Sequence, residues 1–212
     1  NIHKLAEEYG IDKSEILTTY VCKKCGDYEV KAYDGEDKNC RSCASEKTQV
    51  TTNVGAGVRE DQLNEVYNFM DVYCHPFTSG GQEIPIQEAK LTELITLVTD
   101  YSCGEESCEE GSASIPLNWS EYREHQTEFK KASTCPISIA SSIDTVYNMP
   151  NEEVREQGRI ARQWAIDNFS VEVIGKKFEE FIDNSECTNY KFEDEEDKST
   201  TKKNNPDAFI PP

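Results

Sequence analysis

One stretch, residues 71–89, constrains the fold of this chain more than any other. Its sequence is DVYCHPFTSGGQEIPIQEA, in which a short apolar, β-branched run ends at Pro76, Gly80 and Gly81 follow, and apolar residues then recur at helical spacing. A strand, a tight loop and a helix in this order form the repeating unit of α/β domains with a parallel sheet. We therefore expect an α/β fold built around this unit.

The loop in this stretch has the residue types of an anion site. Glycines carry no Cβ, so the backbone at Gly80 and Gly81 can approach a ligand closely, and the first-turn N–H groups of the following helix face the same point. A phosphate is the expected ligand there. Glu88, further along the helix, can accept two hydrogen bonds from a vicinal diol such as a ribose. The alternative is an ordinary β-α turn with Glu88 in solvent.

The same stretch resembles a known donor-site signature. The segment HPFTSGGQEIPIQEA, at 75–89, resembles the motif Pro-Ser-x-x-Glu-Gly-x-Gly-x-Pro-x-x-Glu-Ala of the retaining glycosyltransferases with the GT-B fold, often called glycosyl transferases group one. Glu88 matches the second glutamate, which in that family holds the ribose of a nucleotide-sugar. Gly80 stands where the family's first glutamate contacts the transferred sugar. Either Glu83 replaces that glutamate from a shifted position, or the catalytic site is weakened.

The resemblance covers most of residues 51–183. In that family a helix precedes the strand that carries the donor loop, as residues 61–72 do here, and the glycine-containing loop near residue 57 falls where the chain passes close to the donor base. The resemblance implies a Rossmann-like half of a GT-B fold that takes a UDP- or GDP-sugar and uses no catalytic metal. It also implies donor contacts at Ser79, Gly80, Gly81, Glu88, Gly57 and Val58, and catalytic roles for Glu83 and Glu88.

Two Cys-x-x-Cys pairs give the most specific local signal. Cys22 and Cys25 form one pair, Cys40 and Cys43 form the other, and a strand-like alternation with a turn at 34–35 lies between them. Two such turns joined by a hairpin are typical of a zinc ribbon, in which four thiolates hold a structural zinc ion. Four protein ligands leave no open position for substrate or water, so the ion would do no chemistry. The alternative is a pair of redox-active or merely reduced cysteine turns.

Composition narrows the function classes. The 212 residues carry a formal net charge of −19 with a pI near 4.5, which opposes binding to nucleic acids and to anionic membranes. No run approaches the ~18 apolar residues of a spanning helix, and no secretory signal is visible. Cysteines paired for metal binding are typical of a reducing compartment, so we expect a cytoplasmic protein. Cys103 and Cys108 leave a disulfide or a second metal site open.

The remaining periodic segments complete the predicted domain. Helix 2–9 and strand 16–21 are expected to be the second half of a β-α-β unit whose first strand precedes Asn1, because the chain begins without methionine and without the family's basic motif. An apolar stripe on the last helix, residues 171–182, is expected to pack in the core. The predicted domains are a Rossmann-like domain of residues 1–21 and 50–183, a zinc-ribbon insertion of residues 22–49, and an acidic, flexible tail of residues 184–212.

These features together predict the nucleotide-sugar-binding half of a retaining hexosyltransferase. The acceptor, a glycan or another molecule, would be held by a missing N-terminal domain, so this chain alone would bind the donor weakly or not at all and would transfer nothing. A different hypothesis is a non-catalytic scaffold of the same fold whose zinc ribbon docks a protein partner. Gly80 at the position of the first glutamate favours that second hypothesis.

Overall fold

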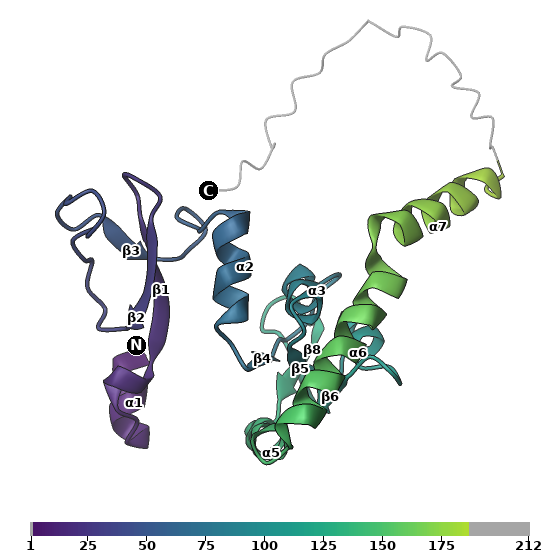
Figure 1. Cartoon of the computed structure of the whole chain (residues 1–212). Coiled ribbons are helices and arrows are strands. Elements are labelled where there is room, and N and C mark those ends of the chain that lie inside the picture. Colours follow the sequence, from purple (N-terminus) through teal and green to yellow (C-terminus); the bar gives the residue numbers. More distant parts are fainter. Residues whose placement is uncertain (1, 187–212) are drawn as a thin grey trace, which may run out of the picture. The chain divides into compact units, whose positions relative to one another are not determined.

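A computed structural model of the chain describes residues 2–186, and Figure 1 labels most of its helices and strands. The chain divides into two units, up to Ile174 and from Gly175. Within the described residues it is a mixed α/β protein with one parallel and two antiparallel sheets. The elements are α1 (Ile2–Tyr9), η1 (Lys13–Glu15), β1 (Leu17–Cys22), β2 (Tyr28–Ala32), β3 (Gln49–Thr51), α2 (Glu60–Asn68), β4 (Val72–His75), α3 (Ile84–Leu91), β5 (Ile95–Thr99), α4 (Cys103–Ser107), β6 (Ser114–Leu117), β7 (Trp119–Arg123), β8 (Lys130–Thr134), α5 (Pro136–Tyr147), α6 (Asn151–Phe169) and α7 (Val171–Asp183).

The parallel sheet organises the larger unit. Its strand order is β4-β5-β6, so β5 is paired along both edges. All five residues of β5 are buried, as is typical of a central strand in a parallel sheet. Ile95 and Leu97 of β5 pack with Leu117 of β6 in the main core cluster. The strand, loop and helix predicted within residues 71–91 are confirmed as β4 and α3.

The first strand of the chain lies in a different sheet from the one predicted. β1 pairs antiparallel with β2 and β3, so residues 17–22 belong to the ribbon sheet. Helix 2–9 and a strand close to 16–21 both form, but the prediction that they continue the parallel sheet is wrong. The physical reason is the short loop between β1 and β2. Because β2 follows β1 after only a few residues, pairing the two strands costs little loop-closure entropy.

Residues 103–134 contain structure that the sequence pattern did not reveal. α4 and the parallel strand β6 come first, and β7 and β8 then form a hairpin. Pro116 lies within β6, where it is tolerated because β6 pairs with β5 along one edge only among the described strands. The same proline concealed the strand, because proline argues against a strand in pattern-based prediction. Leu117 belongs to the core cluster, and Ile115 packs against it.

Three helices, α5, α6 and α7, form the C-terminal part of the described residues, and the predicted last helix is among them. α6 comes close to the turn before β5, where a Cβ added at Gly158 would stand 2.2 Å from the Glu93 carbonyl oxygen. Helix α7 passes from the first unit into the second at Gly175. The expectation that its apolar stripe packs in the core concerns contacts between these two units, and it stays a prediction.

Two further sequence predictions concern the tail and the membrane. Of the predicted tail, residues 184–212, the part from residue 187 onward lies outside the described residues. Across residues 2–186, none of the helices combines the length and apolar character that crossing a bilayer requires.

Lys90 of α3 is fully buried, which is rare for a lysine. Its Nζ donates a hydrogen bond to the Ser112 carbonyl oxygen and lies 4.5 Å from the centroid of the Trp164 ring. Burial lowers the pKa of Lys90 to about 8, because the ammonium loses its hydration. The unfolded chain, with an ordinary lysine pKa, therefore binds more protons than the folded chain between pH 8 and about 10.4.

We predict that replacing this lysine with methionine changes how stability depends on pH. Between pH 7 and about 10.5 the free energy of unfolding of the wild type should rise by roughly 3 kcal/mol relative to Lys90→Met, since deprotonation removes the cost of burying the charge. Urea unfolding at a series of pH values measures this difference. The exposed Lys177→Met is the control and should follow the wild type; parallel curves for the wild type and Lys90→Met would contradict the prediction.

Candidate functional site

Four cysteines come together beside the antiparallel sheet. Cys22 ends β1, Cys25 follows in the next turn, and Cys40 and Cys43 lie between β2 and β3. Their sulfurs all lie within 4.8 Å of one another, with 3.7 Å between the sulfurs of Cys22 and Cys43 and 3.6 Å between those of Cys25 and Cys40. A tetrahedral ion with bonds of about 2.3 Å separates its sulfurs by roughly 3.8 Å. The four predicted ligands are thus brought together at distances that suit a metal such as zinc.

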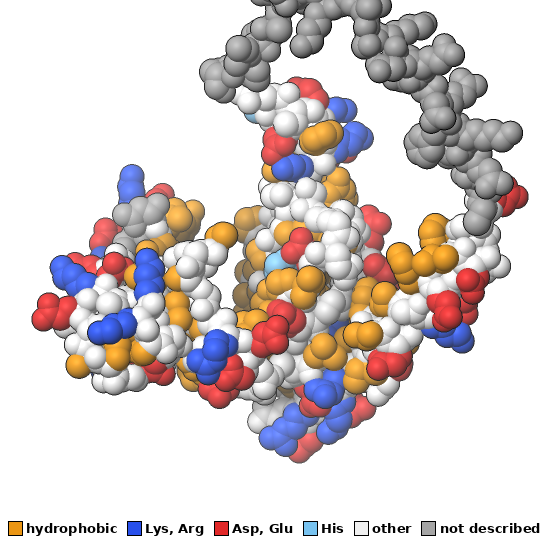
Figure 2. All heavy atoms as spheres, turned by 90° about the horizontal axis from the view of Figure 1, so that it is seen from above, with side chains coloured by type: hydrophobic (Ala, Val, Ile, Leu, Met, Phe, Trp, Pro, Cys, Tyr) orange, Lys and Arg blue, Asp and Glu red, His pale blue; other side chains and the backbone are white. Residues whose placement is uncertain are grey.

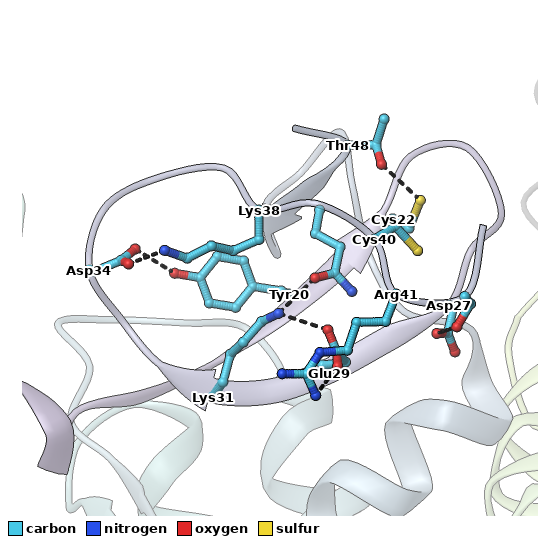
Figure 3. Close-up of polar contacts among 12 residues, drawn as sticks. Tyr20, Cys22, Asp27, Glu29, Lys31, Asp34, Lys38, Cys40, Arg41 and Thr48 are labelled. Atoms are coloured by element: carbon cyan, nitrogen blue, oxygen red, sulfur yellow. Dashed lines mark hydrogen bonds and ion pairs between the residues drawn. The ribbon is translucent and has the colours of Figure 1, made fainter. Parts of the chain in front are cut away.

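Neighbouring hydroxyl and amide groups favour the thiolate form in this cluster. The Lys24 amide donates to Cys22 Sγ at 3.4 Å. Figure 3 shows the second contact of the same sulfur, a hydrogen bond of 3.3 Å with Thr48 Oγ1. The contact with Thr48 lowers the pKa of the Cys22 thiol to about 6. The Ser45 hydroxyl, 3.2 Å from Cys43 Sγ, likewise lowers the pKa of that thiol. Metals bind thiolates, so these contacts favour metal binding at Cys22 and Cys43, whereas the pKa of the neighbouring Cys25 thiol is raised.

Charged side chains brace the sheet that presents the cysteines. Lys31 Nζ donates to Glu29 Oε2 and to Gln49 Oε1, both at 2.7 Å, and the ion pair with Lys31 lowers the pKa of Glu29. Figure 3 shows Lys31 beside the buried Tyr20, whose hydroxyl hydrogen-bonds to Asp34 at 3.4 Å. These contacts join β2 to β1 and β3, and thereby help to hold the two cysteine turns facing each other.

Beyond the carboxyl end of β4, the Glu83 carboxylate fills the space beside Gly80. A Cβ added at Gly80 would stand 2.2 Å from Glu83 Oε1, whereas one added at Gly81 would meet no atom within 4 Å. Gly80 is not among the glycines with a positive φ, so backbone conformation does not require it. A side chain at this position would therefore displace the Glu83 carboxylate from the place it occupies here.

A chain of contacts connects Glu83 with Glu88. His75 Nε2 lies 3.1 Å from Glu83 Oε2, and the Tyr73 hydroxyl lies 3.1 Å from His75 Nδ1. The rings of Tyr73 and Tyr67 meet edge to face with centroids 5.7 Å apart, and the Tyr67 hydroxyl donates to Glu88 Oε2 at 2.9 Å. Burial, followed by the hydrogen bond to Glu88, raises the pKa of Tyr67, so its hydroxyl remains a neutral donor. Both motif carboxylates therefore belong to one polar network.

Glu88 lies in a pocket of about 440 Å³ between α2, α3 and α6. Leu63 and Tyr67 of α2 and Arg162 of α6 are among its lining residues, and a volume in this range suits a small-molecule ligand. Gly80 and Gly81 do not line it, so the expectation that the glycine turn and Glu88 open onto one cleft is not met. The reason is helical geometry. Over the five residues from Glu83 to Glu88, a helix rises by about 7.5 Å, and the two side chains leave its axis in directions that differ by roughly 140°.

The other predicted donor contacts are dispersed. Gly57 and Val58 line a separate pocket of about 310 Å³, which shares the α2 residue Leu63 with the Glu88 pocket. Ser79 is exposed, and its side chain makes no hydrogen bond to any described residue. At the start of α3, Pro85 has no N–H and the Ile86 amide donates to the Glu83 carbonyl oxygen at 3.0 Å. The first turn of α3 therefore offers fewer free donors than predicted.

Sequence reasoning did not assign Tyr67, Tyr73 or His75 to the site. Tyr73 and His75 alternate on β4, which places their side chains on the same face of the sheet, and this signal was present in the sequence. Their partners on other elements were not predictable from it. Cys103 and Cys108, at the two ends of α4, are free thiols and belong to no metal-type cluster among residues 2–186.

Acidic and basic side chains are interspersed on the face of the molecule drawn in Figure 2. That face therefore offers no broad basic surface of the kind that binds a nucleic-acid backbone.

Comparisons with known proteins do not assign a family or a function to this chain. Neither a protein-family model, nor a curated protein, nor a solved structure matches this chain.

We predict that the four-cysteine cluster binds one metal ion, such as zinc, and that the ribbon depends on it. Elemental analysis of the purified chain should find about one ion per chain in the wild type and much less in Cys40→Ser. A strong chelator should lower the melting temperature of the wild type, because metal binding is coupled to folding of such modules. Cys135→Ser, which alters a free thiol outside the cluster, is the matched control and should keep its metal. A metal-free wild type with unchanged melting in chelator would contradict the prediction.

Proposed function

We propose that this chain is the nucleotide-sugar-binding half of a retaining glycosyltransferase and acts together with an acceptor-binding domain. The observation that carries the proposal is the Glu83 carboxylate, which stands where a side chain at Gly80 would begin. In the resembling family the side chain at that position is the glutamate that contacts the transferred sugar. Here the Glu83 carboxylate, from three residues further along the chain, lies beside the point where that side chain would begin.

The two carboxylates have separate roles in this proposal. Glu88 accepts hydrogen bonds from the two ribose hydroxyls of a UDP- or GDP-sugar, and Glu83 accepts hydrogen bonds from hydroxyls of the transferred sugar. Tyr67 contacts one oxygen of Glu88 and His75 contacts one oxygen of Glu83. Among described residues the second oxygen of each carboxylate has no hydrogen bond, which leaves it for the ligand.

The backbone at Gly81, two residues before Glu83, would hold the diphosphate. Gly81 is exposed and no atom crowds the position of its absent Cβ, so a diphosphate can approach its backbone closely. Backbone N–H groups that are fixed before the reaction stabilise the charge that develops on a diphosphate leaving group. The chain would thus bind, orient and stabilise the donor, and the acceptor would approach from the other domain.

The four-cysteine centre is proposed to hold a structural zinc ion. Four thiolates fill a tetrahedral coordination sphere and leave no position for substrate. The ribbon sheet is small, with β2 contributing no buried residue and β3 only three residues in length. Small modules of this kind obtain much of their folding free energy from the metal.

A second candidate function is a non-catalytic scaffold whose ribbon docks a protein partner. The observation that favours it is the separation of Glu88 from the glycine turn, since neither Gly80 nor Gly81 lines the Glu88 pocket. A scaffold would keep the fold and the metal centre and would have no need to bind a nucleotide.

Nucleotide-induced stabilisation distinguishes the two candidates. UDP or GDP at ten times its dissociation constant should raise the melting temperature by roughly 3–6 °C, because the ligand binds only the folded chain. Glu88→Ala should abolish this increase, since the ribose loses its hydrogen-bond acceptor. Glu152→Gln, which removes an exposed carboxylate at the start of α6, is the matched control and should respond like the wild type.

Two results would count against the donor-site proposal. If no nucleotide or nucleotide-sugar stabilises the wild type at millimolar concentration, the scaffold becomes the better account. If Glu88→Ala keeps the full increase, nucleotide binds somewhere other than the Glu88 pocket. Sugar transfer by the isolated chain would contradict the proposed division of labour between two domains.

A further inference from the structure

A second pocket, distinct from that of Glu88, lies between the segment after β4 and the β7–β8 hairpin. Its volume is about 620 Å³, and its lining residues include Phe77 and Thr78 after β4, Ser120 and Tyr122 of β7, and Ser133 of β8. The carboxyl ends of parallel strands are where open α/β sheets bind their ligands. This pocket adjoins the carboxyl end of β4, so its position alone makes it a candidate for a ligand.

The hairpin that forms one wall is anchored to the sheet edge. The Ala132 amide donates to the Thr78 carbonyl oxygen at 2.8 Å, and Thr134 Oγ1 lies 2.7 Å from Thr99 Oγ1 at the end of β5. The Tyr101 hydroxyl donates to the Lys130 carbonyl oxygen at 3.0 Å. These contacts fix the wall before any ligand arrives, and a preformed wall lowers the cost of binding.

The chemistry of the lining favours an uncharged ligand with many hydroxyls. No charged side chain lines the pocket, although 30% of the residues in this chain are charged. Lys131, opposite Tyr122 in the hairpin, is paired with Glu124. Four lining hydroxyls make no hydrogen bond with any described residue and are available to a ligand, namely those of Thr78, Ser120, Tyr122 and Ser133.

From this lining we infer that the pocket binds an uncharged sugar ring. A pyranose carries hydroxyls around its edge and C–H bonds on its faces, so it can hydrogen-bond to free hydroxyls and pack one face on an aromatic ring. Tyr122, 39% exposed, supplies such a ring. This inference goes beyond the donor site, because binding here requires neither Glu88 nor a nucleotide. The site would hold a glycan next to the edge of the sheet where the donor is proposed to bind.

Saturation-transfer NMR on the full chain tests this site with the methyl glycosides of glucose, galactose and mannose as probes. At least one of them should receive saturation from the wild type. Tyr122→Ala should weaken its binding by roughly tenfold, the value expected for loss of an aromatic contact and one hydrogen bond. Ser133→Ala should weaken it less. Tyr147→Ala, which removes a tyrosine that is 86% exposed on α5, is the control and should bind like the wild type.

The outcomes separate this inference from the donor-site proposal. Glu88→Ala should leave glycoside binding unchanged, and Tyr122→Ala should leave stabilisation by nucleotide unchanged. The sugar site is refuted if none of the three glycosides binds, or if both Tyr122→Ala and Ser133→Ala bind as well as the wild type while their amide spectra show a folded chain. Loss of glycoside binding in Tyr147→Ala as well would also refute it, since binding would then lie elsewhere.

Discussion

Burial of β5 along its whole length, with a parallel partner on each edge, is the constraint on which the rest of the larger unit depends. A strand with both edges and both faces covered is built from residues that tolerate burial: Leu97 and Val98 are fully buried within it, and the hydroxyls of the buried Thr96 and Thr99 are hydrogen-bonded. Its neighbours must then run in the same direction, so the chain returns each time through a helix or a loop that crosses over. Their carboxyl ends meet at one edge of the sheet. The glycine turn, Glu83 and the anchoring contacts of the β7–β8 hairpin all lie close to these strand ends.

The hydroxyls at the end of β5 connect this edge to its surroundings. Thr99 is buried, accepts a hydrogen bond from the Phe77 amide at its side-chain oxygen, and contacts Thr134 of the hairpin through the same oxygen. One side chain therefore joins the segment after β4 to the hairpin. Burying a hydroxyl costs free energy unless it is hydrogen-bonded. A fully hydrogen-bonded hydroxyl therefore favours one arrangement of the segments that it connects. The donor motif and the proposed sugar pocket are thus held by the same sheet edge.

The sequence predicted those parts of the fold that depend on local pattern. Strand β5, helix α2 and the unit formed by β4 and α3 follow from short-range periodicity. The pairing of β1 did not, because a strand's pattern does not name its partner, and the nearby hairpin competed successfully with a distant parallel strand. The hairpin of β7 and β8 has mostly exposed side chains, so it carries little hydrophobic signal.

The candidate sites, too, were predictable only where they depend on local sequence pattern. Cysteine spacing alone indicated the four ligands that the structure brings together, because two chelating turns on a hairpin have few other arrangements. The polar network was not predictable, since Tyr67 on α2 reaches Glu88 on α3 only through the tertiary fold. The role of Gly80 also differs from the sequence argument. The sequence suggested a glycine that lets a ligand approach, whereas the structure shows one whose missing side chain makes room for Glu83.

The most direct measurement of the central claim is the affinity of nucleotide-sugar relative to the free nucleotide, determined by calorimetric titration of Gly80→Ala and Gly81→Ala. A Cβ at position 80 would displace the Glu83 carboxylate, whereas one at position 81 would meet no atom. The account predicts that Gly80→Ala, like Glu83→Gln, lowers this ratio by about tenfold or more through loss of a charge-assisted hydrogen bond to the sugar, and that Gly81→Ala keeps it. An unchanged ratio in Gly80→Ala would contradict the claim that Glu83 stands in for the missing glutamate.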